Sequence, residues 1–260
     1  LAPRVQAANA ARIARDLGLD AAALTRGRHV VEKALAAGTP VTRSALYACM
    51  EAAGFASAHQ RGLHMLNWLA HEGAICQGPR HGKQPTFVLM DAWVPPSAPL
   101  GRDEALHRLA LRYLQGHGPA TAADLAWWSG LTQKDALRAL ALAGSALEKE
   151  TRDGTTWWWR ADAPIPARSR AIHLLPAFDE YLIGYRDRTP VLDAPHTRRV
   201  IGINGLVAAT AIVQGRVVAT WNRAGDTDVA LAPLRALADA EHEGIQRAAQ
   251  RWRRFLGHAR

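Results

Sequence analysis

Cysteine is almost absent from this chain of 260 residues, which contains only Cys49 and Cys76. The two do not form a Cys-x-x-Cys pair, so no disulfide framework is expected, and the composition suits a reducing cytoplasm. Long apolar runs are also missing, since none approaches the roughly 20 residues that span a bilayer. These absences exclude a disulfide-stapled secreted protein and a helical membrane protein.

Motifs of several enzyme classes are missing or incomplete as well. The sequence has no Gly-x-x-x-x-Gly-Lys phosphate loop and no Gly-x-Ser-x-Gly nucleophile elbow. His71-Glu72 begins a His-Glu-x-x-His metal motif, but Ile75 occupies the position of the second histidine. Asp179 and Glu180 are acid/base candidates by type, yet adjacent helical carboxylates point in different directions, which favours a helix-start or arginine-pairing role. We therefore expect no catalytic residue, no metal and no cofactor.

Acidic residues are fewer than basic ones, 23 against 32, which gives a net charge of +9. The balance is +5 over residues 1–90, −1 over 91–163 and +5 over 164–260. An excess of positive charge favours a polyanionic partner. Many unrelated soluble proteins share such an excess, so charge alone leaves nucleic-acid binding open.

Two segments predict the same order of elements. In the first, Thr42 and Ser57 are the expected N-caps of the second and third helices. A turn-rich loop over 78–84 separates two strand-like runs. The helices of this segment are expected over 24–37, 43–53 and 58–72, and its strands over 74–76 and 86–89.

The second segment repeats this order, and its N-cap Thr121 follows Thr42 by 79 residues. Thr132 caps the third helix, and Asp153-Gly154 is a strong two-residue hairpin signal. The helices are expected over 103–115, 122–129 and 133–143, and the strands over 146–150 and 155–159. Three helices followed by a β-hairpin are typical of the winged helix, a DNA-binding arrangement. Two generic helix-and-hairpin units without a ligand are the alternative, and the repetition favours DNA binding.

The remaining sequence predicts a mixed α/β module. A proline-rich linker over 94–99 separates the two repeated segments, and strand signals begin near residue 163. The expected elements are strands over 172–175, 206–213, 216–221 and 227–231 and a helix over 234–256. The predicted fold is therefore α+β, with tandem winged-helix units over 1–93 and 94–162 and a mixed α/β module over 163–260.

Polar residues of the first segment's third helix and loop are the main candidates for DNA contact, because such side chains read base edges or hold phosphates. The helix contributes His59, Arg61, His64 and Asn67, the loop contributes Arg80, His81 and Lys83, and the third module contributes Arg186, Arg188 and Arg216. The alternative is a solvated helix face and an exposed turn. In the second segment Gln133, Lys134 and Arg138 occupy equivalent places, but acidic neighbours at Asp135 and 148–150 indicate a structural role.

The tryptophans gather in two runs, 127–128 and 157–159. Indole rings stack on exposed bases in single-strand-binding proteins. Core packing is the favoured interpretation here, because the runs lie on a predicted helix and a predicted strand.

The stretch Leu-Leu-Pro-Ala-Phe-Asp-Glu-Tyr-Leu-Ile-Gly-Tyr-Arg-Asp-Arg at 174–188 resembles a hallmark of bacterial winged-helix DNA-binding-domain proteins. This family includes AlkZ-type and YcaQ-type DNA glycosylases. Further stretches that are similar to it lie at 78–84, 118–131, 204–205 and 213–218. Together they extend over nearly the whole chain in the family's order.

The resemblance implies tandem winged helices that form a concave, basic DNA-binding surface. It also implies excision of alkylated purines, and unhooking of interstrand crosslinks by some members, without a metal or organic cofactor. The family's Gln-hydrophobic-Gln or Gln-hydrophobic-Asp motif positions the attacking water. That motif is absent here, and the nearest approach is Gln133-Lys134-Asp135, with lysine at the hydrophobic position.

The family carries that motif in an N-terminal unit, and this chain begins at Leu1 rather than methionine, so we expect it to start after the motif. We predict a DNA-binding protein that resembles the non-catalytic part of an alkylpurine or crosslink glycosylase. A non-enzymatic winged-helix transcriptional regulator is the alternative. The expected partner is duplex DNA, alkylated duplex included, and neither a membrane nor a small-molecule cofactor is expected.

Overall fold

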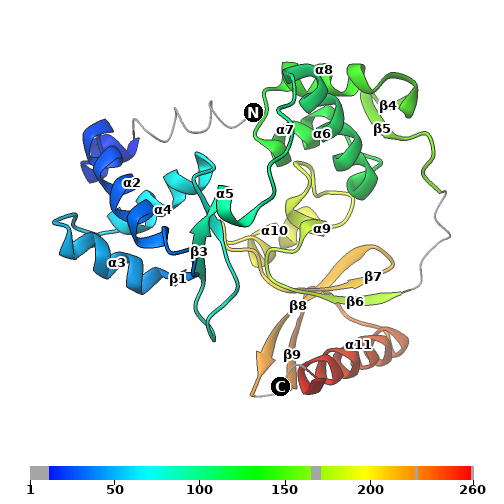
Figure 1. Ribbon diagram of the computed structural model, residues 1–260. Helices are drawn as coiled ribbons and strands as arrows, with labels where there is room; N and C mark the ends of the chain where they lie inside the picture. Colours follow the sequence, from blue (N-terminus) through cyan, green and yellow to red (C-terminus); the bar gives the residue numbers. More distant parts are fainter. Residues whose placement is uncertain (1–11, 165–170, 226–227, 259–260) are drawn as a thin grey trace. The chain divides into compact units, whose positions relative to one another are not determined.

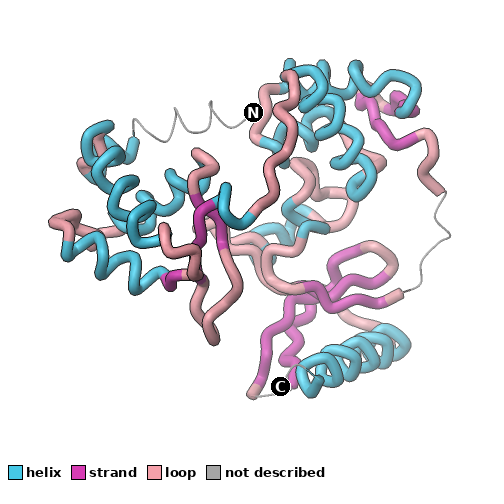
Figure 2. Tube along the Cα trace, in the orientation of Figure 1, coloured by secondary structure: helices cyan, strands magenta, loops and turns pink. Residues whose placement is uncertain are grey.

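The computed structural model describes residues 12–164, 171–225 and 228–258. The chain falls into two compact units, Leu1–Leu100 and Gly101–Arg260. Each unit combines α-helices with small antiparallel sheets, as Figures 1 and 2 show. The predicted mixed α+β class is thereby confirmed. The division into three parts near residues 93 and 162 stays a prediction.

The first unit contains helices and one three-stranded sheet. After a helical segment over 12–17, its elements are α2 (Ala21–Leu35), β1 (Val41–Thr42), α3 (Arg43–Ala52), α4 (Arg61–His71), β2 (Ile75–Gln77), β3 (Thr86–Leu89) and α5 (Met90–Trp93). The sheet is antiparallel with the order β1-β3-β2. The short strand β1, which pairs Val41 with Phe87, was not expected from the sequence.

Side-chain caps fix where the helices of the first unit begin. Thr42 accepts a hydrogen bond from the Ala45 amide at 3.3 Å, which confirms the predicted cap of α3. Asp20 accepts one from the Ala23 amide at 2.7 Å, so α2 begins three residues before the predicted Leu24.

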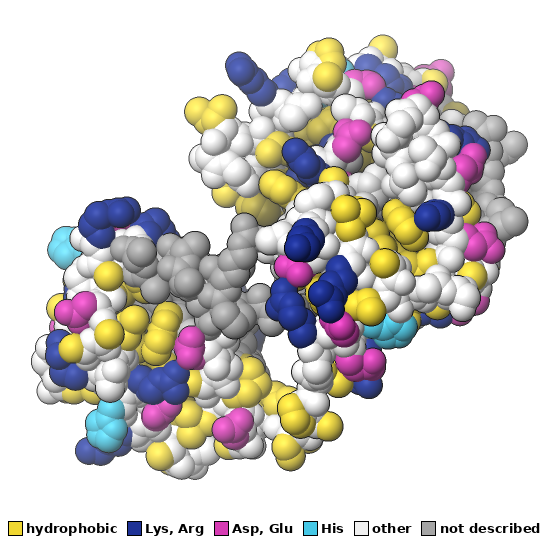
Figure 3. Space-filling view, turned by 90° about the horizontal axis from the view of Figure 1, so that it is seen from above, with side chains coloured by type: hydrophobic (Ala, Val, Ile, Leu, Met, Phe, Trp, Pro, Cys, Tyr) yellow, Lys and Arg dark blue, Asp and Glu magenta, His cyan; other side chains and the backbone are white. Residues whose placement is uncertain are grey.

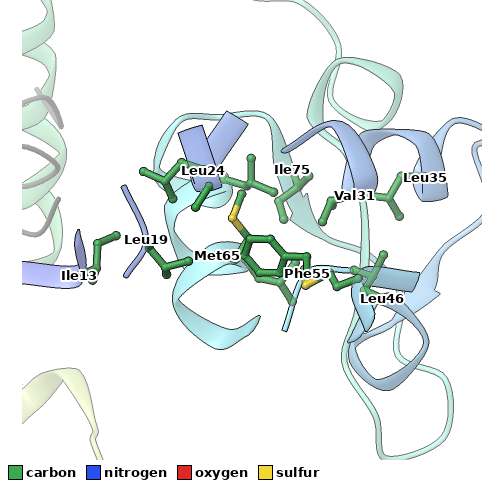
Figure 4. Packing of buried hydrophobic residues seen from close by; sticks show 13 residues of the cluster. Ile13, Leu19, Leu24, Val31, Leu35, Leu46, Phe55, Met65 and Ile75 are labelled. Carbon is green, nitrogen blue, oxygen red and sulfur yellow. The ribbon is translucent and has the colours of Figure 1, made fainter. Parts of the chain in front are cut away.

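The core of the first unit lies where α2, α3 and α4 meet the sheet (Figure 4). Val31, Leu46 and Met65 are fully buried there, and burial of each such side chain contributes about 1.5–3 kcal/mol. A Cβ atom at Gly27 would approach Met65 Sδ to 2.6 Å, so a larger residue on α2 would force the Met65 side chain on α4 to shift.

The second unit opens with the same order of elements. These are α6 (Arg102–His117), α7 (Ala122–Ser129), α8 (Gln133–Ala143), a 3-10 turn η1 (Gly144–Ala146), β4 (Leu147–Arg152) and β5 (Thr155–Arg160). The predicted caps Thr121 and Thr132 both accept hydrogen bonds from N3 amides. A single bridge between Ala120 and Trp158 occupies the place that β1 and β3 have in the first unit.

The rest of the second unit is a four-stranded antiparallel sheet with helices. Its elements are β6 (Ile172–Leu175), α9 (Glu180–Ile183), a 3-10 turn η2 (Ala194–His196), α10 (Thr197–Val200), β7 (Thr210–Val213), β8 (Arg216–Ala224), β9 (Asp228–Pro233) and α11 (Asp239–His258). The order is β6-β7-β8-β9. Helix α11 packs against β6 and β9 (Figure 1), and residues from α9 and α10 form a separate core cluster with Ile212 and Val217.

Several predicted boundaries in this part are wrong: β8 runs to Ala224 rather than 221 and β9 to Pro233 rather than 231, and the two largest differences concern starts of elements. The strand expected to begin at 206 begins at Thr210, because Val207 forms an isolated bridge with Ile201 instead. The helix expected from 234 begins at Asp239, because β9 extends to Pro233 and Leu234 is buried beside the sheet. Thr227, the expected first residue of the last strand, lies outside the described residues. Across the described ranges, no helix is long and apolar enough to cross a membrane.

Candidate nucleic-acid interface

Helix α4 carries the first group of predicted contact residues. It buries Gly62, Met65, Leu66 and Leu69 toward the core. On its other side Asn67 is exposed and His64 is half-buried, as the helical pattern predicts. The polar face of α4 is therefore available for a ligand, although its contact with DNA stays a prediction.

The start of α4 differs from the prediction. Gln60 is the N-cap residue, and its side chain makes no capping hydrogen bond. His59 and Gln60 have positive φ angles of 51° and 67° and form a turn before the helix. The predicted cap Ser57 is wrong, because its amide and hydroxyl donate hydrogen bonds to Glu51 at 2.5 and 2.7 Å. These bonds hold the pKa of Glu51 below its ordinary value.

Arg61 is engaged within its own unit. Its guanidinium donates to the carbonyl oxygens of Ala56, at 3.1 Å, and of Leu17. It also lies 5.4 Å from the centre of the Phe55 ring, a cation–π arrangement. The side chain thus joins α4 to two loops, and its predicted DNA contact would compete with these bonds.

This arrangement predicts a structural effect of Arg61→Ala. We expect a loss of about 2 kcal/mol in the free energy of unfolding, because two hydrogen bonds and one ring contact disappear. Denaturant unfolding of the whole chain measures it, with Arg26→Ala on the exposed side of α2 as control. Unchanged stability together with a weaker salt dependence of DNA binding would instead assign Arg61 to the DNA.

The loop between β2 and β3 carries the second group. His81 and Gln84 exchange backbone hydrogen bonds of 3.1 and 3.0 Å, and Gly82 between them has a φ of +59°. Arg80, His81 and Lys83 are exposed on this loop. Within the described part of the chain, the side chains of Arg80 and Lys83 have no hydrogen-bond or ion-pair partner. This loop, residues 80–84, is called the basic loop below.

Two hydrogen bonds hold the basic loop and the residue after it against the start of α3. Ser44 Oγ donates to Gln84 Oε1 at 3.1 Å, and the Arg43 amide donates to the Pro85 carbonyl at 3.3 Å. The exposed Arg43 therefore belongs to the same surface. Nothing in the sequence pattern distinguishes Arg43 from other arginines, and only the pairing of β1 with β3 explains its position. The arrangement suits contact with phosphate groups.

Several other arginines of the described chain form ion pairs with acidic side chains. On the face seen in Figure 3, Lys and Arg side chains of both units lie among Asp and Glu side chains. In the helical part of the second unit, Arg138 pairs with Asp103 at 2.7 Å, and Arg102 pairs with Asp135 at 3.0 Å. These pairs link α8 to the start of α6. They support the structural role predicted for the residues of α8.

The family-like stretches 118–131 and 174–188 contact each other in the second unit. The indole nitrogen of Trp127 donates to the Ile183 carbonyl at 3.1 Å, and that of Trp128 donates to Glu180 Oε1 at 2.6 Å. Tyr185 Oη donates to the His117 carbonyl at 3.1 Å. These bonds join α6 and α7 to α9 and the residues directly after it.

A glycine and a buried tyrosine complete this junction. Tyr113 Oη donates to the Gly184 carbonyl at 3.1 Å, and burial raises the pKa of Tyr113. The Tyr113 ring stacks on His117 with 4.5 Å between centroids. A Cβ atom at Gly184 would come within 2.8 Å of the His117 ring, so the hallmark glycine permits close approach.

The centre of the junction is Asp124, a position that was not predicted from the sequence to be functional. Its side chain is 3% exposed. It accepts hydrogen bonds from the amide and hydroxyl of Thr121, at 2.9 and 2.7 Å, and from the amide of Arg186, at 2.8 Å. The signal in the sequence was the Thr-x-x-Asp capping-box pattern.

The three arginines predicted from the third module differ in their surroundings. The side chain of Arg186 is exposed. Arg188 donates to the Leu182 carbonyl at 2.6 Å and lies 5.4 Å from the Trp127 ring centre, and burial lowers its pKa. Arg216 donates to the Pro190 carbonyl at 3.0 Å and pairs with Asp193. Their DNA contacts stay predictions, and Arg186 is the most accessible of the three.

The tryptophan runs divide between core and surface. Trp158 packs against the core of the second unit, whereas Trp127 is 55% exposed. Trp157 and Trp159 are half-buried and line a cavity of ≈ 640 Å³ with Pro119. Among the residues that the structure describes, no group of three or more His, Cys, Asp or Glu side chains is placed to hold a metal ion.

Comparison with known proteins identifies the family. A sequence model of the AlkZ-like DNA glycosylases matches residues 1–255. The interstrand DNA cross-link repair glycosylase of Streptomyces sahachiroi is 29% identical over 173 residues, which are 60% of this chain and 45% of that protein. The aligned part of this chain therefore spans less than half the length of that relative.

The fold comparison agrees. The structure of the Streptomyces sahachiroi DNA glycosylase AlkZ has a TM-score of 0.74 and 22% identity, over 94% of this chain and 69% of that chain. At this identity the likeness concerns the fold. The family match, which extends over nearly the whole chain, confirms the resemblance seen in the sequence: this chain belongs to the AlkZ-like DNA glycosylase family.

Proposed function

We propose that this chain binds duplex DNA and serves in DNA repair. The family and the name of the Streptomyces relative favour repair over the alternative of a transcriptional regulator. Cross-linked or alkylated duplex is the proposed form of the partner. The Gln-hydrophobic-Gln/Asp motif is absent from the sequence, so the role proposed for these residues is binding, and base excision is assigned to none of them.

The proposed architecture is two tandem winged helices followed by the mixed α/β module. The order α2, β1, α3, α4, β2, β3 with the sheet order β1-β3-β2 supports this for the first unit. The order α6, α7, α8, β4, β5 with the bridge at Ala120 supports it for the second. In such folds the third helix enters a DNA groove and the hairpin contacts the backbone. Helix α4 and the basic loop would take these roles.

The observation that carries the proposal is the contrast between the two hairpins. The basic loop of the first unit exposes Arg80 and Lys83 without acidic partners in the described chain. In the second unit Arg152 on β4 pairs with Glu150 at 2.8 Å, and Glu148 accepts from Trp159. Phosphate groups would therefore be attracted to the first hairpin rather than the second.

A salt titration tests the proposal. Binding of the whole chain to a fluorescently labelled duplex would be followed by anisotropy between about 50 and 200 mM salt. About six phosphate contacts predict a slope near −5 in a plot of log K against log salt. The same duplex after alkylation provides the comparison for lesion preference. A slope near zero would remove DNA binding from consideration.

A further inference from the structure

A tight turn follows α10 in the second unit. Ile201 and Val207 form a bridge at its base. The Gly202 amide donates to the Leu206 carbonyl at 2.9 Å, and the Gly205 amide donates to the Gly202 carbonyl at 2.9 Å. Residues 202–206 therefore form a small closed loop, called the tip below.

The tip stands on a rigid base. Val200 and Val207 on either side are 1% and 7% exposed and belong to the same core cluster. Asn204 Oδ1 accepts from the Leu206 amide at 3.3 Å, and Gly205 has a φ of +77°, which a residue with a side chain rarely adopts. The position of the tip is thus fixed by the fold.

The tip presents apolar side chains to solvent. Ile203 is 99% exposed, the highest value among the exposed large apolar residues of the described chain, and Leu206 is 59% exposed. Full burial of an isoleucine contributes about 1.5–3 kcal/mol, and here none of that is realised within the chain. An apolar tip on a rigid base indicates contact with a partner.

The charge near the tip indicates what that partner is. From residue 194 to 207 the sequence has two arginines and one histidine but no acidic residue. Arg198 is exposed, and Arg199 donates to the Pro233 carbonyl at 3.0 Å, which ties α10 to the end of β9. A partner that binds both the arginines beside the tip and its apolar side chains must have an anionic exterior and an apolar interior. Duplex DNA has this chemistry, with phosphates outside and stacked bases inside.

We infer that Ile203 is a wedge that inserts between stacked base pairs when the chain binds duplex DNA, with Arg198 against the neighbouring phosphate. The inference rests on the proposed function and deepens it. Apolar wedges of this kind partially unstack one base step and kink the duplex. A repair protein gains from such a wedge because unstacking exposes a modified base to inspection.

The test uses a duplex that contains 2-aminopurine, whose fluorescence rises when it loses its stacking neighbours. We expect the whole chain to raise this fluorescence, and Ile203→Ala to reduce the rise by about fivefold or more. Ile203→Phe should retain the rise, because it restores an apolar wedge. Leu137→Ala is the matched control, since Leu137 is an exposed leucine of the same unit, 48% accessible on α8.

The outcomes separate the wedge from DNA binding itself. Because Ile203 makes no phosphate contact, the slope of the salt titration should be the same for the chain and for Ile203→Ala. If the salt titration gives the slope expected for DNA binding but 2-aminopurine fluorescence does not rise, the wedge is overturned and DNA binding stands. An equal rise for the chain and for Ile203→Ala would have the same meaning. A slope of log K against log salt near zero would overturn both the wedge and the proposed binding to DNA. If Ile203→Ala instead abolished binding to anionic lipid vesicles or self-association, the tip would belong to that partner.

Discussion

Replacing Asp124 with alanine is expected to lower the free energy of unfolding of the second unit by about 3–4 kcal/mol. The carboxylate is buried and accepts hydrogen bonds from the amides of Thr121 and Arg186. Alanine would leave both amides without an acceptor, at about 1–3 kcal/mol each, and would remove the capping box of α7. Denaturant unfolding of the whole chain, followed by tryptophan fluorescence, measures the loss.

Asp135→Ala is the matched control for this prediction. Asp135 occupies the same third position of its helix, α8, and accepts from the hydroxyl of the cap Thr132 at 2.9 Å. Asp135 is only half-buried, however. In the variant, water would therefore solvate the Arg102 guanidinium that loses its ion pair with Asp135. We expect a clearly smaller loss of stability than for Asp124→Ala, because solvent screens and replaces the interactions of this side chain. Equal losses in the free energy of unfolding for the two variants would show that Asp124 only caps α7 and that its bond to the Arg186 amide adds no stability.

Structure that depends on neighbouring residues could be predicted from the sequence. Thr42, Thr121 and Thr132 cap their helices as expected, because a cap and its amide lie three residues apart. The strands Thr86–Leu89 and Ile172–Leu175 have the predicted bounds, since turn signals and apolar runs are local as well. These signals were sufficient for the mixed α+β class.

Competition between distant residues could not be predicted. Ser57 has the composition of a cap, but Glu51 binds its hydroxyl and amide first. The two-residue strand β1 exists only because β3 pairs with it, and the paired residues Thr42 and Thr86 are 44 positions apart in the sequence. Neither event leaves a periodic signal in the sequence.

The candidate site shows the same division. The residue types identified the cationic side chains. They did not indicate which of these side chains form hydrogen bonds within their own unit. Arg61, Arg188 and Arg216 all donate to backbone carbonyl oxygens of their own unit, whereas Arg80 and Lys83 are exposed. The bond from the Arg186 amide to Asp124 connects residues 62 positions apart, and the capping-box pattern reveals only the local half of that carboxylate's role.

The double variant Arg80→Ala/Lys83→Ala is expected to weaken binding to duplex DNA by about 30-fold near 0.1 M salt. Each side chain would lose about 1 kcal/mol of phosphate contact, and 1.4 kcal/mol corresponds to a factor of ten. The slope of log K against log salt should become shallower by about 2, because two fewer counterions are released. Stability should be unchanged, since neither side chain bonds to the described chain.

Arg102→Ala/Arg138→Ala removes the same net charge and is the control that separates location from charge. These arginines are exposed like the first pair, but each is neutralised by an aspartate, at 3.0 and 2.7 Å. Their loss should change affinity by less than about threefold, because only long-range, salt-screened attraction is altered. Similar weakening in both double variants would mean that DNA responds to net charge alone. An unchanged slope in Arg80→Ala/Lys83→Ala would place the phosphate contacts away from the basic loop, since contacts that remain after the loop is neutralised must be made elsewhere.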